Sequence, residues 1–173
     1  MLARKISRAK WDPKEYLAET EIPADAISGC LRTTDNALSW WRCTNDEGSI
    51  AEVALALTAG PKIDRFDKID VVVLPEAELA KAGLALKPTK GATVVKDLQS
   101  RHVDLNGLDV ERLAKVARIL GPRIRIGSEV VQFTQARLET LVNTAIHNKR
   151  LDANQLSEKL QAKIAGQGGA PPA

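Results

Sequence analysis

Residues 69–74 read IDVVVL, and this nearly continuous run of β-branched side chains decides the fold class of the chain. A strand covered on one face alternates apolar and polar residues, whereas a strand covered on both faces is apolar almost throughout. The run therefore predicts a central buried strand near 69–74. Pro75 and Gly83 bracket a short helix directly after it. A buried strand flanked by helices indicates an α/β fold around a small mixed sheet, with α+β as the alternative.

Capping and periodicity extend this interpretation toward the N-terminus. Ser49 and Glu52 have the spacing of a capping box, which predicts a helix from there to Gly60. Residues 38–43 alternate with the period of two that is typical of a strand. Residues 22–31 carry apolar side chains at helical spacing behind a proline, so we expect a short helix there.

Two short apolar segments follow the central strand and its helix. Residues 84–86 and 92–95 are separated by a turn that contains Pro88 and Gly91, which predicts that they pair as a hairpin. Residues 103–105 fit a short edge strand.

The second half of the chain has the character of a helical segment. A helix from 108 is expected to end at Gly121 and Pro122, because proline disrupts a helix interior. Residues 123–126 alternate and predict a short strand or connector. A long helix is expected over about 129–148, and a final helix after 152.

These elements predict one globular domain over residues 22–165, with an α/β part to about 106 and a helical part over 107–165. Residues 1–21 lack a sustained apolar period, so we expect an N-terminal arm lying over the domain. Residues 166–173 are rich in glycine and proline and carry no charge, which predicts a disordered tail.

The composition is that of an ordinary globular protein that needs no disulfide or structural metal ion for its stability. The 173 residues are 44% hydrophobic and 27% charged, and the net charge of +3 is too small to imply a polyanionic partner by itself. Cys30 and Cys43 fit free thiols in a reducing compartment as well as they fit a single disulfide, and we expect the former. No apolar stretch has the length of a secretory signal or a membrane span, so we expect a protein that does not enter a membrane. Together with free thiols, this makes a bacterial cytoplasm the expected location.

Catalytic, metal and cofactor chemistry find little support in the residue pattern. Ser100, His102 and Asp104 alternate, but side chains in a row on one strand do not converge as a catalytic triad does. His102 and His147 lack the paired spacing of zinc ligands. Cys43 follows Arg42, yet a small buried hydrophobe is the commoner role of such a thiol. No glycine-rich phosphate loop occurs, and we expect no cofactor.

Trp40, Trp41 and Arg42 are the candidate protein-binding residues. Consecutive residues of a strand face opposite ways, so one indole is exposed if only one face of the strand is covered. Tryptophan and arginine contribute strongly to protein interfaces. The alternative is a strand covered on both faces, which would bury both indoles.

Basic residues provide the candidate nucleic-acid contacts. Lys5 and Arg8 lie near the N-terminus, and Arg123 and Arg125 lie near one expected helix end. Acidic residues are interspersed with the second group, and cations near a helix C-terminus are expected from the helix dipole alone.

The chain is therefore expected to be a non-enzymatic accessory, adaptor or immunity-type protein that binds another protein. The C-terminal helices also make self-association a candidate. A protein that contacts the phosphates of a nucleic acid is the first alternative. An enzyme whose site is assembled from scattered residues is the second.

Overall fold

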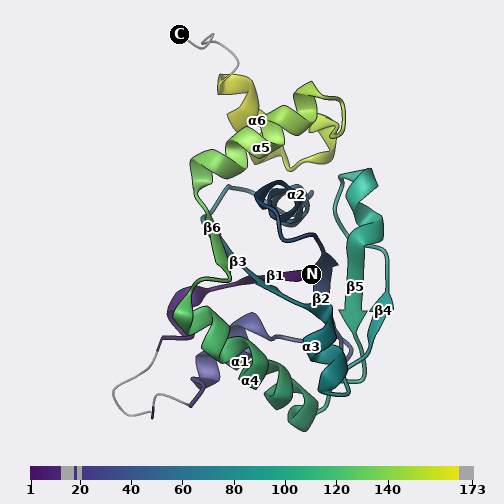
Figure 1. Ribbon diagram of the computed structural model, residues 1–173. Helices are drawn as coiled ribbons and strands as arrows, with labels where there is room; N and C mark the ends of the chain where they lie inside the picture. Colours follow the sequence, from purple (N-terminus) through teal and green to yellow (C-terminus); the bar gives the residue numbers. More distant parts are fainter. Residues whose placement is uncertain (13–17, 19–20, 168–173) are drawn as a thin grey trace.

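The computed structural model describes residues 1–12, 18 and 21–167 and shows a six-stranded sheet between two helical layers (Figure 1). The strand order is β4-β5-β2-β1-β3-β6. The strands are β1 (Leu2–Ile6), β2 (Leu38–Arg42), β3 (Ile69–Leu74), β4 (Leu86–Pro88), β5 (His102–Leu105) and β6 (Val130–Phe133). The α/β class is confirmed. The sheet was expected to be mixed, but neighbouring strands in the described residues all pair antiparallel.

Each face of the sheet is covered by its own set of helices (Figure 1). One layer consists of α2 (Glu47–Thr58), α5 (Gln135–His147) and α6 (Glu158–Gln167). The other consists of α1 (Ala24–Cys30), α3 (Glu76–Lys81) and α4 (Val110–Ile126). Three short 3₁₀ turns are η1 (Arg8–Lys10), η2 (Lys96–Arg101) and η3 (Ala153–Gln155). The strands therefore separate two hydrophobic cores.

The run over residues 69–74 is the buried strand that its composition predicts. All six side chains of β3 are buried, and both faces contribute to a core. Asp70 is the one charged residue within it. Its carboxylate accepts hydrogen bonds from the backbone N–H of Arg8, at 3.3 Å, and from the side-chain amide of Gln132 on β6, at 3.0 Å. These donors allow a carboxylate inside the strand, because they replace the water it loses.

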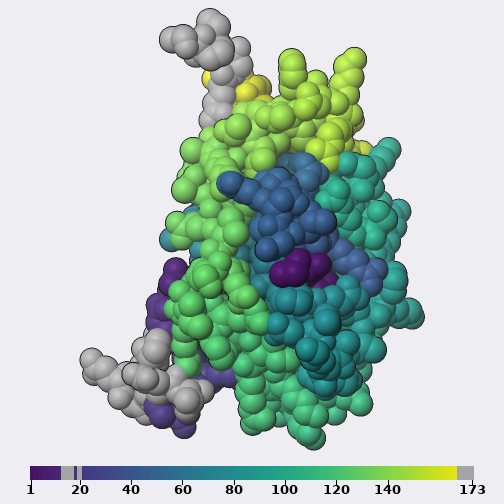
Figure 2. Space-filling view, viewed as in Figure 1, coloured from purple at the N-terminus to yellow at the C-terminus, as the bar shows by residue number. Residues whose placement is uncertain are grey.

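The expectation of an N-terminal arm is wrong for residues 2–6. They form β1, which lies between β2 and β3, and Leu2 and Ala3 are completely buried. Figure 2 shows the N-terminal atoms, in purple, enclosed between the blue segment of α2 and the teal segment of α3. Five residues with two lysine or arginine side chains show too little periodicity to reveal a central strand. The rest of the expected arm includes residues 13–17, 19 and 20, which lie outside the described residues.

Two local predictions before residue 106 need correction. Asp46, not Ser49, is the N-cap of α2, and its carboxylate accepts from the backbone N–H of Ser49 at 2.7 Å. The helix thus begins earlier than the capping box implied. The predicted hairpin is also wrong, because β4 pairs with β5 and residues 92–95 form no strand.

The helical half contains a strand that the sequence pattern concealed. Helix α4 continues through Pro122 to Gly127, whose φ of 82° ends it in the left-handed region. The burial of Ile124 explains why the helix continues past the proline, because packing can outweigh the local cost. Residues Val130–Phe133 form β6 rather than the start of a helix, and Thr134 then caps α5. Most of the expected tail, residues 168–173, lies outside the described residues.

Candidate functional site

Strands β1 and β2 separate along part of their length, and this separation opens a seam in the sheet. They pair only at Leu2 with Arg42 and at Ala3 with Trp41, whereas β1 pairs with β3 over its whole length. A hollow of about 330 Å³ lies where the two strands diverge. Its lining comes from both strands and from the flanking helices: Arg4, Lys5, Ile6, Ser7, Gly29, Cys30, Ser39, Trp41 and Leu57.

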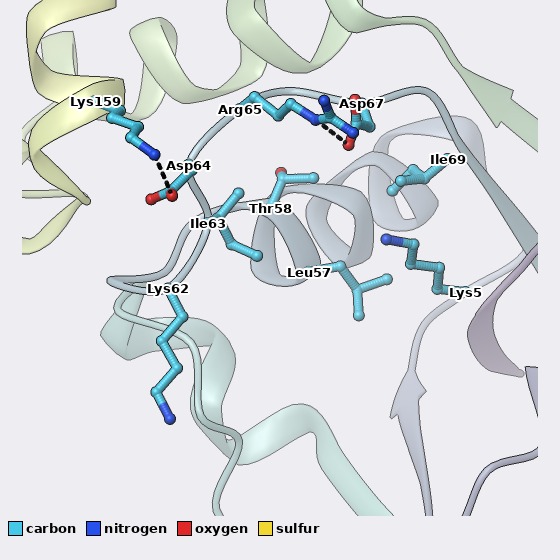
Figure 3. Close-up of a pocket in the computed structure, with 10 residues that line it drawn as sticks. All are labelled: Lys5, Leu57, Thr58, Lys62, Ile63, Asp64, Arg65, Asp67, Ile69 and Lys159. Atoms are coloured by element: carbon cyan, nitrogen blue, oxygen red, sulfur yellow. Dashed lines mark hydrogen bonds and ion pairs between the residues drawn. The ribbon is translucent and has the colours of Figure 1, made fainter. Parts of the chain in front are cut away.

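Two further hollows meet this seam at Leu57, which is partly buried near the end of α2. One has a volume of about 430 Å³ and lies between Lys5 and the loop after α2 (Figure 3). The other, of about 460 Å³, lies between that loop, Trp41 and His102. Because each pair of hollows shares lining residues, we treat the three as one surface and call it the Leu57 groove.

The floor of the Leu57 groove is apolar and its rim is cationic. The partly buried side chains of Leu57 and Ile63 supply apolar surface, and the almost fully buried Trp41 lies at the wall of two of the hollows. Lys5 and Lys62 lie on the rim, are exposed, and form no ion pair within the described residues. In Figure 3 the Lys5 side chain extends from β1 toward Leu57 and Ile69, and the Lys62 side chain extends from the loop after α2 away from the ion pairs drawn there.

The other charges that line the hollow of Figure 3 neutralise one another. Asp64 pairs with Lys159 at 2.9 Å, and Arg65 pairs with Asp67 at 2.8 Å (Figure 3). The Lys159 ammonium also holds the pKa of the Asp64 carboxyl below its usual range. The uncompensated positive charge of this hollow therefore comes from two lysines outside both pairs.

Arg4 reaches across the seam from β1. Its guanidinium donates to the backbone oxygen of Cys30, at 3.1 and 2.8 Å, and to that of Ser39 on β2. The guanidinium also lies 5.9 Å from the ring centre of Trp40. Burial lowers the pKa of Arg4 to about 10, although charge interactions with Cys30 and, less strongly, with Asp104 oppose this effect. Arg4 is thus a desolvated cation at neutral pH, bonded to carbonyls but to no carboxylate in the described residues.

A polar cluster lies beside the groove, where β5 meets β2 and the residue after β4. Asp104 accepts hydrogen bonds from Ser39, at 3.0 Å, and from the hydroxyl of Thr89, at 2.8 Å. The same hydroxyl lies 2.8 Å from Nδ1 of His102. Since Thr89 gives its only proton to the carboxylate, Nδ1 must carry a hydrogen and donate to Thr89.

This direction of hydrogen bonding indicates that the cluster holds neighbouring strands together and does not activate the Thr89 hydroxyl as a nucleophile. The imidazole donates to the hydroxyl and takes no proton from it, which is the reverse of a nucleophile and its base. Ser100 lies on η2 and is exposed, so the expected row of Ser100, His102 and Asp104 does not form on β5. The carboxylate instead joins three strands.

The stability of the protein is expected to fall in mild acid because of His102. Burial lowers the pKa of His102 below 6.5, and Asp104 opposes that shift only in part. Between the lowered pKa and 6.5 the unfolded chain binds a proton that the folded protein does not, so the free energy of unfolding decreases as the pH falls. Urea unfolding at pH 7.5 and 5.5 measures this, and His102→Gln should show a smaller decrease. Equal decreases in both proteins would contradict the prediction, and the exposed His147→Gln serves as the matched control.

The tryptophan pair does not present an exposed indole. Trp40 is 0% exposed and Trp41 is 6% exposed, because helices cover both faces of β2. The premise of the predicted protein-binding site is therefore wrong. Arg42 is exposed, and its guanidinium pairs with Glu76 at 3.0 Å, which raises the pKa of Arg42.

The four predicted nucleic-acid contacts do not form a single surface of free cations. Arg123 is only 20% exposed at its side chain and pairs with both Glu78 and Glu129. Arg125 donates to the backbone oxygen of Glu21, and Arg8 lies against Gly127 at the end of α4. Lys5 alone lines the Leu57 groove. Phosphate contact by Arg123 would require the loss of two carboxylate partners.

Thiol and metal chemistry are not favoured by the described residues. Cys43 is buried, and burial raises the pKa of its thiol, which keeps it protonated and unreactive. Across residues 1–12, 18 and 21–167, His, Cys, Asp and Glu side chains form no group of three or more suited to a metal ion. Within the same residues, no helix combines the length and apolar character needed to cross a bilayer.

Sequence reasoning singled out Lys5 and Trp41, which both line the groove, but missed Arg4, Leu57 and Lys62. Arg4, Leu57 and Lys62 come from a strand, a helix and a loop, so no spacing in the sequence connects them. The short pairing of β1 with β2 also leaves no local signal, because it depends on which strands become neighbours.

Comparisons with protein-family models, with curated proteins and with solved structures find no match to this chain.

Proposed function

We propose that this chain is a non-enzymatic accessory or adaptor protein that holds an acidic, extended segment of a partner protein in the Leu57 groove. The observation that carries the proposal is the pairing of an apolar floor with two lysines that have no carboxylate partner in the described residues. Apolar side chains would enter the hollows beside Leu57, and acidic side chains would meet the ammonium groups of Lys5 and Lys62. Charge complementarity of this kind favours an acidic partner and speeds its association.

An extended segment fits the shape of the groove better than a compact ligand does. The three hollows lie around one partly buried leucine and share their walls, so the side chains of one strand-like peptide can occupy them in turn. The proposal places the protein in a reducing compartment, such as a bacterial cytoplasm, because Cys30 and Cys43 are buried free thiols.

Peptide selection tests this function and does not require the partner to be identified. A display library of random 12-residue peptides is selected on the immobilised full chain and on the double variant Lys5→Glu with Lys62→Glu. We expect the wild type to enrich peptides with acidic and apolar residues. Selected peptides should bind the double variant at least tenfold more weakly, because two favourable charge contacts become repulsive.

The matched control reverses two exposed cations on the opposite helical layer, Lys81 of α3 and Arg118 of α4. Lys81→Glu with Arg118→Glu changes the net charge equally, and its peptide affinity should stay within twofold of the wild type. No enrichment, or equal weakening by both double variants, would reject the groove. Preferential binding of a DNA oligonucleotide, with a steep loss of affinity in salt, would instead assign a nucleic-acid partner.

A further inference from the structure

The seam holds a cation whose charge is poorly compensated. Arg4 is partly buried, and each of its three nitrogens donates one hydrogen bond to a backbone oxygen. A guanidinium has five N–H groups, so one donor remains on each terminal nitrogen. Carbonyl oxygens satisfy hydrogen bonds but carry no full charge, and a desolvated cation is strongly stabilised by an anion in contact with it.

The surroundings of Arg4 add positive charge rather than negative charge. Lys5 lines the same hollow, and the end of the Lys10 side chain lies against Gly29 at the hollow's wall. The groups whose charge raises the pKa of Arg4 are Cys30 and, with a smaller effect, Asp104. The two oxygens of Asp104 already accept from Ser39 and Thr89, and its carboxylate forms no ion pair with the guanidinium in the described residues.

The position of the guanidinium is fixed before any ligand arrives. Its bonds to Cys30 of α1 and Ser39 of β2 join two elements across the seam, and the indole of Trp40 lies beside it. A guanidinium that is already held in place loses less conformational freedom on binding than a mobile lysine side chain does. The seam hollow of about 330 Å³ leaves space next to the Arg4 guanidinium for a small oxyanion.

We propose that the seam is an anion subsite of the Leu57 groove in which Arg4 and Lys5 bind one carboxylate of the acidic segment. This inference rests on the proposed function and specifies its anchor. The carboxylate accepts from the free N–H groups of Arg4 and from the ammonium of Lys5. Leu57 then separates this anchor from the side chains that occupy the other two hollows.

A double-mutant cycle tests the anchor with one peptide from the selection. Each glutamate or aspartate of the peptide is replaced in turn by its amide and measured by fluorescence anisotropy against wild type and Arg4→Gln. One replacement should weaken binding to the wild type about tenfold and binding to Arg4→Gln less than twofold. A version of the peptide with an amidated C-terminus shows whether the anchor is a side chain or the terminal carboxylate.

Controls separate anchoring from a purely structural role of Arg4. If Arg4 only caps α1 and bridges to β2, Arg4→Gln shifts the affinity for all peptides equally, and no single position shows coupling. In the same cycle with Lys62→Gln, the peptide position whose replacement loses its effect should be a different one. If Arg4→Gln does not fold, the same cycle with the exposed Lys5→Gln must show coupling at one position, and its absence rejects the subsite. A peptide that binds with coupling to Lys62 alone refutes this inference and leaves the proposed function standing, whereas no peptide binding at all refutes the proposed function.

Discussion

A chain that begins at Ser7 is expected to lose cooperative unfolding altogether. The deletion removes β1, which pairs with β3 at all five of its residues and with β2 at two of them. Its loss would leave the facing edges of β2 and β3 without partners inside the protein. Each buried backbone group without a hydrogen bond costs about 1–3 kcal/mol, and the sum approaches the roughly 5–15 kcal/mol that stabilises a whole domain.

Circular dichroism during urea titration measures this result. The control is the full chain with Arg8→Gln and Lys10→Gln, which removes two cations of η1 but leaves β1 intact. It should unfold in a single transition close to that of the wild type. A sharp transition in the truncated chain would show that residues 2–6 lie outside the cooperative core, as an arm would.

Replacement of Trp40 by alanine is expected to lower the free energy of unfolding by about 3–5 kcal/mol, as for other large buried aromatic residues. Trp40 is completely buried, and it packs in the core formed with α1 and α4. The alanine would leave a cavity between the sheet and this helical layer. Urea unfolding monitored by circular dichroism, with the slope of the transition unchanged, measures the loss.

Trp40→Phe gives the matched comparison for this cavity. The indole N–H of Trp40 has no hydrogen-bond partner in the described residues, so phenylalanine removes an unsatisfied donor along with some apolar volume. We expect a loss of only about 1–2 kcal/mol. A loss below about 1 kcal/mol for Trp40→Ala would contradict the burial of this side chain, because exposed substitutions usually change stability by less than about 0.5 kcal/mol.

The failed predictions share a physical cause, which is the dominance of distant contacts over local preference. Pro122 normally ends a helix, yet α4 continues because Ile124 enters the core. Residues 130–133 follow a pattern that also fits a helix, and they become β6 because β3 offers an edge with which to pair. Neither the continuation of α4 nor the formation of β6 can be predicted from its own segment alone.

The candidate site shows the same limit more strongly. Lys5 is visible as a basic residue, but its significance depends on Leu57 and Lys62, which come from a distant helix and the loop after it. Trp40 and Trp41 looked informative because aromatic residues are few, and the structure buries both. Residue type indicates what a side chain is able to do, whereas burial decides whether a partner can reach it.

The amino-acid sequence alone determined the α/β class, the buried strand over residues 69–74 and the short helix after it, because backbone preference and apolar patterning act locally. The tertiary structure decided that residues 2–6 complete the sheet and that β1 and β2 diverge to form the seam. Strand pairing joins segments that are far apart in the chain, so its geometry appears only when the whole chain is folded.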